Sequence, residues 1–204
     1  MDDKKIDLMP AVAVRGIATG MLMMAFFTFI WIGIAYGSLI DTNFKFVLII
    51  FPLFVIAFII NAVKLFKISK HYPVLTDEAD IAEGKKLGKW FGIIFGAEGL
   101  GIFIAVNIVT NLGHADLTIP VIALIVGLHF FPLARVFKRT IDYYLATGAT
   151  IVAVLGIIFT LNKTIPQNAI TAFVGIGIAI ATTAYGTYMM ISGWKTTKPV
   201  ILPI

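Results

Sequence analysis

Two ionisable residues, Glu98 and His129, stand far inside long apolar runs of this sequence. A carboxyl or an imidazole in hydrocarbon is costly unless it has a partner, a proton or water. A paired Glu and His can hold one proton between them, which is the chemistry of a protonatable site on a transport path. The same pair can serve only as a buried polar contact that fixes one helix against another. Both interpretations require the two residues to lie at similar depth.

The positions of the two residues along the chain give them compatible depths. Glu98 lies nine residues after Lys89, about 14 Å along a helix that rises ~1.5 Å per residue. His129 lies six residues before Arg135, about 9 Å from that basic boundary. Because a hydrocarbon core is about 30 Å thick, Glu98 comes close to its midplane. The remaining difference in depth is within reach of the side chains, so a direct contact is allowed.

Other polar residues and two prolines surround this pair in the predicted arrangement. Asn61 and Tyr185 fall in the same half of the membrane by residue count and can supply neutral hydrogen bonds. Pro132, three residues after His129, removes a backbone hydrogen bond and is expected to kink its helix. Pro52 is expected to kink a second helix in the same way. The predicted substrate or proton site comprises Glu98, His129, Asn61 and Tyr185.

The residue inventory argues against most catalytic chemistry. The chain has no cysteine, three scattered histidines and no HExxH motif, so we expect no zinc or iron–sulfur site and no other metal or cofactor. It has no Walker-type glycine loop, so it is not expected to hydrolyse ATP. Its few serines stand near the ends of the apolar runs, which disfavours a buried Ser–His nucleophile. We expect no catalytic residue, and a membrane-embedded enzyme is the third alternative for function.

The composition predicts an integral membrane protein. Of the 204 residues, 59% are apolar and 13% are charged, and the mean hydropathy is +0.97. Soluble domains have about 45–50% apolar and about 25% charged residues. Water-soluble enzymes, disulfide scaffolds and disordered chains are therefore excluded. We expect one all-α membrane domain over residues 1–204.

Apolar segments long enough to span a bilayer, which takes about 20 residues, occur six times. The expected helices cover residues 16–36, 46–63, 77–110, 119–137, 143–161 and 169–193. The first run is longer than a usual signal-peptide core and is predicted to be retained. The third begins with Thr76, Asp77 and Glu78, where a capping side chain and carboxylates suit a helix N-terminus. This helix is expected to extend beyond the bilayer into the cytosol.

Basic residues give the six-helix bundle an orientation. Fourteen of the 16 Lys and Arg residues are predicted on one side, against Lys45 and Lys163 on the other. The positive-inside rule then places both termini in the cytoplasm of a multi-pass cell-membrane protein. The net charge of +5 suits anionic lipid headgroups and needs no nucleic-acid partner. Trp31 is expected as an outer interfacial anchor, and Arg135 with Asp142 as a solvated interfacial pair.

A row of glycines at four-residue spacing marks the third expected helix. It comprises Gly84, Gly88, Gly92 and Gly96. Such a bare stripe lets another helix backbone approach closely. The partner is either a second copy of the chain, which would make a homo-oligomer, or a helix of the same bundle.

One block of the sequence carries a resemblance to known proteins. It runs Val126-Gly127-Leu128-His129-Phe130-Phe131-Pro132-Leu133-Ala134-Arg135 and is followed by Tyr143-Tyr144-Leu145-Ala146-Thr147-Gly148. It resembles a widespread group of small, uncharacterised bacterial multi-helix membrane proteins with a G-L-H-F-x-P-L-A stretch, here Gly127 to Ala134. The resemblance implies a bacterial inner-membrane setting. It implies no activity, substrate or cofactor.

The sequence leaves three classes of function open. A proton-linked transporter or channel-like protein requires a hydrated cavity that reaches Glu98 and His129. A non-catalytic accessory or structural subunit requires a dry bundle in which these side chains satisfy each other. An enzyme requires a nucleophile or metal cluster that the sequence does not offer. A structure that shows whether a cavity touches Glu98 separates the first two.

Overall fold

A computed structural model describes residues 9–74, 76–163 and 165–196 of the chain. Within these residues, six helices are long and apolar enough to cross a membrane, as the sequence predicts, and no strand is present. The helices are α1 (Ala11–Ser38), α2 (Ile50–Ile68), α3 (Glu78–Asn111), α4 (Thr118–Phe137), α5 (Thr140–Asn162) and α6 (Gln167–Thr196). Short 3₁₀ turns flank α2 (Asn43–Ile49 and Ser69–His71) and precede α4 (Ala115–Leu117).

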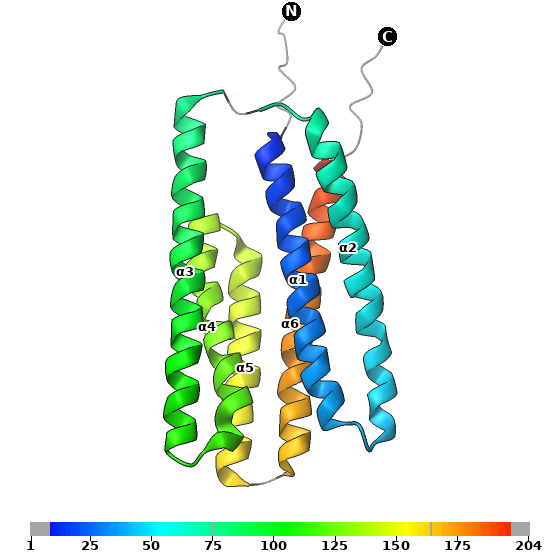
Figure 1. The fold of residues 1–204 in the computed structure, drawn as a ribbon, viewed down its shortest axis with the longest axis vertical. Coiled ribbons are helices and arrows are strands. Elements are labelled where there is room, and N and C mark those ends of the chain that lie inside the picture. Colours follow the sequence, from blue (N-terminus) through cyan, green and yellow to red (C-terminus); the bar gives the residue numbers. More distant parts are fainter. Residues whose placement is uncertain (1–8, 75, 164, 197–204) are drawn as a thin grey trace, which may run out of the picture.

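Successive helices run in opposite directions, so α1 begins and α6 ends at the same end of the bundle (Figure 1). We call this the basic end, because most of the described lysines and arginines lie in the α2–α3 and α4–α5 connections there or in the helical turns nearest to them. Lys45 and Lys163 belong to connections at the opposite end. Lys4, Lys5 and Lys198, predicted on the basic side, lie outside the described residues.

Helix α6 lies at the centre of the packing. It contacts α1, α2, α4 and α5, while α1 also packs on α2, and α4 on α5. Apolar side chains from these helices, among them Met21, Phe58 and Ile178, fill the interior. Trp31 is buried in the same interior, so its predicted role as an interfacial anchor is wrong. Its large ring gains more from packing against α6 than from a place at the membrane surface.

The close helix contacts occur at glycines other than the row on α3. A Cβ added at Gly127 of α4 would lie 2.8 Å from the backbone nitrogen of Thr150, so α4 and α5 meet almost backbone to backbone. In the described part of the chain, no atom lies within 4 Å of a Cβ added at any member of the row, Gly84, Gly88, Gly92 and Gly96. Of the two partners considered for this row, a helix of the same bundle is therefore not found in close contact with it, and a second copy of the chain stays a prediction.

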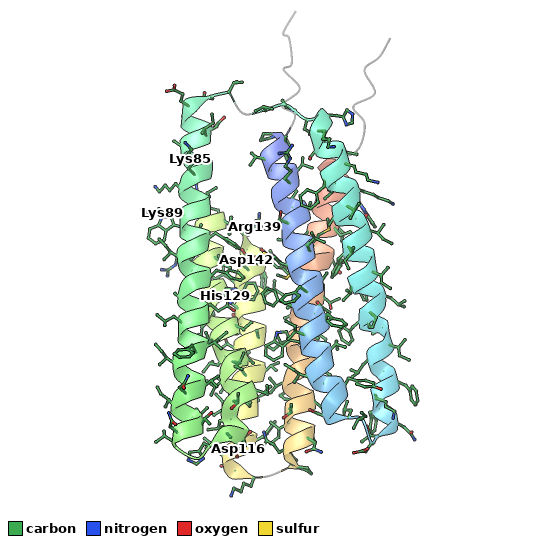
Figure 2. The ribbon with its side chains drawn as sticks, in the orientation of Figure 1. Lys85, Lys89, Asp116, His129, Arg139 and Asp142 are labelled. Atoms are coloured by element: carbon green, nitrogen blue, oxygen red, sulfur yellow. The ribbon has the colours of Figure 1, made fainter. Side chains whose placement is uncertain are left out.

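Helix α3 stands at the margin of the bundle and packs mainly on α4 (Figure 1). Its start is as predicted, because the Asp77 carboxylate accepts a 2.8 Å hydrogen bond from the backbone N–H of Ala79. Lys85 and Lys89 point away from the other helices (Figure 2). The side of α3 turned toward α1 is therefore free of these basic groups.

Pro132 and Pro52, the two prolines at which kinks were expected, occupy different positions in their helices. Pro132 lies inside α4, where it deprives the carbonyl of Leu128 of its helical partner, as predicted. Pro52 lies in the first turn of α2, directly after the 3₁₀ turn Asn43–Ile49. A proline in a first turn removes an N–H that has no helical partner. Pro52 therefore lies close to the point where the 3₁₀ turn becomes an α-helix, and the kink expected there stays a prediction.

Candidate functional site

A cavity of about 1470 Å³ lies between α1, α3, α4 and α6. It extends from Met9 and Asp77 at the basic end to Trp31 and Glu98 further in. Its volume exceeds the roughly 300–1,000 Å³ of typical small-molecule sites. It exists because α3 packs mainly on α4 and leaves the space toward α1 largely unfilled.

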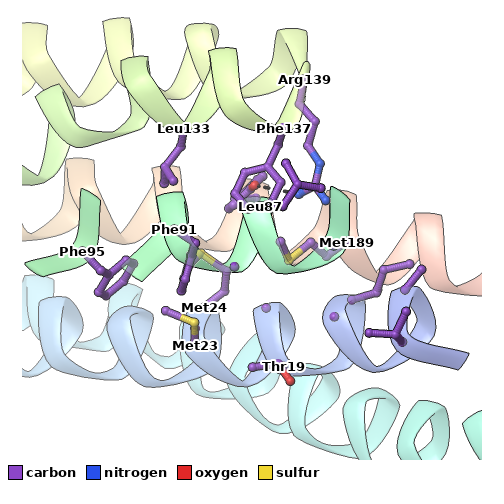
Figure 3. Close-up of a pocket in the computed structure, with 18 of the residues that line it drawn as sticks. Thr19, Met23, Met24, Leu87, Phe91, Phe95, Leu133, Phe137, Arg139 and Met189 are labelled. Atoms are coloured by element: carbon purple, nitrogen blue, oxygen red, sulfur yellow. Dashed lines mark hydrogen bonds between the residues drawn. The ribbon is translucent and has the colours of Figure 1, made fainter. Parts of the chain in front are cut away.

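The wall of this cavity is mostly apolar and rich in methionine and phenylalanine. Figure 3 shows side chains from four parts of the chain turned toward one space, among them Met23, Met24, Leu87, Phe91, Phe95, Leu133, Phe137 and Met189. Methionine is unbranched and polarizable, so it adapts to occupants of different shape. The wall therefore suits apolar molecules of different shapes.

Glu98 and His129 meet on the cavity lining, as their predicted depths allow. The Glu98 Oε1 and His129 Nδ1 atoms are 3.4 Å apart, and each side chain is 8% exposed. This is an ion-pair distance, longer than the roughly 2.7–3.2 Å of a good hydrogen bond. The contact joins α3 to α4 and leaves room for one proton to bind either partner.

An aromatic layer lies one helical turn from this pair, toward the basic end. The Phe27 ring of α1 and the Phe95 ring of α3 have centroids 6.2 Å apart, which bridges the gap between the two helices. Phe95 also meets the His129 ring edge-on at 5.8 Å. Phe27 and Phe95 therefore line the same cavity next to the Glu98–His129 contact.

A second polar cluster lies where α4 and α5 join. Arg139 Nη1 donates a 3.1 Å hydrogen bond to the Tyr185 hydroxyl, and its guanidinium lies 4.9 Å from the centroid of the Phe137 ring. Asp142 is fully buried near Tyr185 and Arg139, and neither of its carboxyl oxygens has a hydrogen-bond partner in the described part of the chain. Figure 2 places His129 further from the basic end than Asp142 and Arg139. Arg139 and Tyr185 line the cavity beside the Glu98–His129 pair.

The expected solvated pair of Arg135 and Asp142 is wrong. Arg135 is exposed, whereas Asp142 is buried with Arg139 and Tyr185 as its polar neighbours. The reason is the tight connection between the helices: α4 ends at Phe137 and α5 begins at Thr140, which turns the first turn of α5 toward α6.

Asn61 lies apart from the cavity, so its predicted place beside Glu98 is wrong. Its amide nitrogen donates to the Ala57 carbonyl at 2.8 Å and contacts Met190 Sδ at 3.4 Å, and its oxygen accepts from Trp194 Nε1 at 2.8 Å. It is not among the described residues that line the cavity. Helix α2 packs on α1 and α6, on the far side of the bundle from α3 (Figure 1).

One buried hydroxyl pair was not predicted from the sequence. The Thr28 and Thr182 hydroxyl oxygens are 2.8 Å apart, Thr28 is fully buried, and Thr182 lines the inner part of the cavity. Thr182 also donates to the Ala179 carbonyl, as threonines in helices commonly do. A lone threonine in an apolar run such as Thr28 gives too weak a signal to pair it with a residue on another helix.

The chemistry available at this site is proton binding and hydrogen bonding. Among the described residues, no group of three or more His, Asp or Glu side chains is placed to hold a metal ion. Comparisons of the chain with protein-family models, with curated proteins and with solved structures found no match. The resemblance of the stretch from Gly127 to Ala134 therefore stays a prediction.

Proposed function

We propose that this six-helix membrane protein is a small proton-linked transporter whose proton site is the Glu98–His129 pair. The observation that carries the proposal is the cavity, which reaches both side chains from the basic end. The bacterial cell membrane, a cytoplasmic basic end and contacts of its lysines and arginines with anionic lipid headgroups belong to the same proposal.

Proton coupling follows from the placement of this pair. A buried carboxyl next to an imidazole is neutralised either by a proton of its own or by a proton on the imidazole. Glu98 and His129 are nearly enclosed but lie on the wall of a space large enough for a solute. A solute that changes the polarity around Glu98 therefore changes how readily this carboxyl holds its proton.

The first test measures proton entry into proteoliposomes. Potassium-loaded vesicles treated with valinomycin develop an interior-negative potential, and an entrapped pH dye reports the protons that enter. We expect vesicles with the wild-type protein to acidify faster than empty vesicles, with a rate that depends on pH. Glu98→Gln keeps the size and most of the hydrogen bonding but cannot release a proton, so it should reduce entry to the rate of empty vesicles.

The matched control is Glu78→Gln, the same chemical change on the same helix. Glu78 is exposed at the start of α3 and is not among the described residues that line the cavity. It should behave as the wild type. Equal proton entry with Glu98→Gln and wild type would contradict the proposal. So would the absence of entry in both, with Glu98→Gln more thermally stable at every pH. That second outcome would favour the accessory-subunit alternative, in which the pair only fixes α3 against α4.

A further inference from the structure

The charges on the cavity wall have the opposite sign to the charge of the whole chain. The lining contains four carboxyl side chains and one guanidinium, although the chain carries a net charge of +5. The carboxyls are those of Asp77, Asp80, Glu83 and Glu98, and the guanidinium is that of Arg139. The first three are exposed near the basic end and Glu98 is buried further in. A solute that enters from this end therefore passes carboxylates before it reaches Glu98.

The positive charge of Arg139 already has partners. Its guanidinium donates to the Tyr185 hydroxyl, lies over the Phe137 ring and acts on the fully buried Asp142. An anion that binds Arg139 would have to compete with its hydrogen bond to Tyr185 and its contact with the Phe137 ring. The guanidinium of the described lining is consequently engaged, and the other basic side chain there, His129, faces the Glu98 carboxyl.

The lysines of α3 are also kept out of the cavity. Lys85, Lys86 and Lys89 are exposed and absent from the described lining, and Figure 2 shows Lys85 and Lys89 on the outer side of the helix. Asp80 and Glu83, only a few residues away, do belong to the lining. The cytosolic extension predicted for α3 thus divides its charges, with acids toward the cavity and lysines away from it.

The apolar part of the wall favours a cation as well. Five phenylalanines line the cavity: Phe27, Phe91, Phe95, Phe130 and Phe137. The face of an aromatic ring carries partial negative charge and attracts a desolvated cation, by about 2 kcal/mol in favourable cases. The adaptable methionines Met23, Met24 and Met189 surround the same space. An apolar molecule with a delocalised positive charge is complementary to all of these features.

We infer that the cavity binds a lipophilic cation, with Glu98 as its counter-ion. This inference rests on the proposed proton-linked function and names its substrate class. Binding of the cation releases the proton held by Glu98 and His129, so cation and proton compete for one carboxyl. The other titratable or charged groups facing this part of the cavity are Tyr185 of α6, with Arg139 and Asp142 behind it. Among the described residues, α1 contributes no charged side chain to the lining.

Two ions of nearly identical shape and opposite charge test the inference. Tetraphenylphosphonium is a lipophilic cation, and tetraphenylborate is the corresponding anion. Each is titrated by equilibrium dialysis into the full-length protein in phosphatidylcholine nanodiscs, with empty nanodiscs as the blank for partition into lipid. We expect the cation to bind at least about tenfold more tightly than the anion, because a carboxylate near the ion contributes more than ~1.4 kcal/mol in a partly dry site.

Substitutions locate the bound cation. Glu98→Gln should weaken tetraphenylphosphonium binding at least about tenfold and abolish the proton release seen in weakly buffered solution. The triple variant Asp77→Asn, Asp80→Asn, Glu83→Gln should slow association and reduce its salt dependence while changing the affinity less. Asparagine at position 77 still caps α3. Glu78→Gln, outside the described lining, should match the wild type.

The outcomes separate the substrate class from the proposed function. Equal or tighter binding of tetraphenylborate would overturn the inference, and so would the absence of binding by both ions. Cation binding that is insensitive to Glu98→Gln would overturn the role of Glu98 as counter-ion. In each of these cases, proton entry that still depends on Glu98 would leave the proposed transporter standing. Should proton entry be absent as well, both proposals fail. The comparison of the two ions uses the unmodified chain, so it holds even if a variant does not fold.

Discussion

The two members of the Arg139–Asp142 pair are unequally buried, and this predicts unequal costs of removing them. Asp142 is fully buried, whereas Arg139 is only half-buried and lines the cavity. Arg139→Gln removes the charged donor to Tyr185 and the positive charge near the buried carboxyl, and should lower the free energy of unfolding by about 2 kcal/mol. Asp142→Asn leaves an arginine that can turn toward the cavity, and should cost about 1 kcal/mol. Thermal unfolding in detergent measures both.

Two further variants sharpen this comparison. Arg135→Gln removes an exposed arginine from the last turn of α4 and should change stability little. The double variant Arg139→Gln, Asp142→Asn should be more stable than Arg139→Gln alone, because no buried charge then remains unpaired. If Asp142→Asn lowered the free energy of unfolding more than Arg139→Gln, the difference in burial would not explain the costs of removing the two residues.

At the residue scale, the depth of a side chain along the bundle could be predicted from the sequence, but the residues that contact this side chain could not. A constant helical rise and two basic boundaries gave Glu98 and His129 depths that allow the contact seen in the structure. The same count of residues placed Asn61 in the correct half of the bundle but on the wrong side of it, because depth does not say which helices lie adjacent. Asp142 was missed for a related reason: the sequence did not show that the first turn of α5 faces α6.

At the scale of the element, the glycine row on α3 predicts tolerance to larger side chains. Gly92→Leu should leave thermal stability within ~0.5 kcal/mol of the wild type, since an added Cβ meets no described atom. If the row is a seam between two copies of the chain, the proposed homo-oligomer should also dissociate. Native mass spectrometry of the protein released from detergent measures the mass of the complex, and the unfolding curve measures stability.

The matched control is Gly127→Leu on α4. The new side chain would press on the backbone of Thr150. The variant should therefore lose at least about 1–3 kcal/mol of unfolding free energy and melt at a lower temperature than the wild type. If Gly92→Leu unfolded the protein as severely as Gly127→Leu, a contact of α3 within the bundle would have to exist that the described arrangement lacks.

The helices themselves were predictable because each is an apolar run long enough to cross a membrane. All six expected segments are helices, and the capped start of α3 at Asp77 was anticipated from residue types alone. The failures concern how elements begin and meet. The change from a 3₁₀ turn to an α-helix just before Pro52 could not be predicted, because the turn is as apolar as the helix itself. The glycine row was not assignable, because close spacing of glycines does not identify the neighbour.

At the scale of the whole molecule, the distribution of basic residues predicts the orientation in the membrane. Reporter fusions at Asp80 and after Ile204 should be cytoplasmic, and fusions at Asp116 and Lys163 should be external. Asp116 lies at the end opposite the basic end (Figure 2), so the fusions sample both ends of the bundle. An external reporter at Asp80 would reverse the orientation and place the mouth of the cavity outside the cell.

The cavity itself could not be predicted from the sequence. A cavity depends on which helices fail to meet, and each helix carries enough apolar residues to pack on any other. Only the arrangement shows that α3 packs mainly on α4 and leaves a cavity toward α1. The candidate site is thus a property of the order of helices around α6, which hydropathy does not encode.

The attachment of α3 through one neighbour gives the molecule two mechanical parts. Five helices share a common interior, while α3 is joined to it by the α4 face, the Phe27–Phe95 ring contact and the connections at its two ends. One of those ends contains Gly113 with a φ of 79°, a conformation that glycine adopts without strain. Tilting α3 as a rigid lever would disturb few of the contacts that hold the remaining helices together. We expect the cost of widening the cavity to come mainly from the contacts of α3 with α4 and with Phe27, and less from the packing among the other five helices.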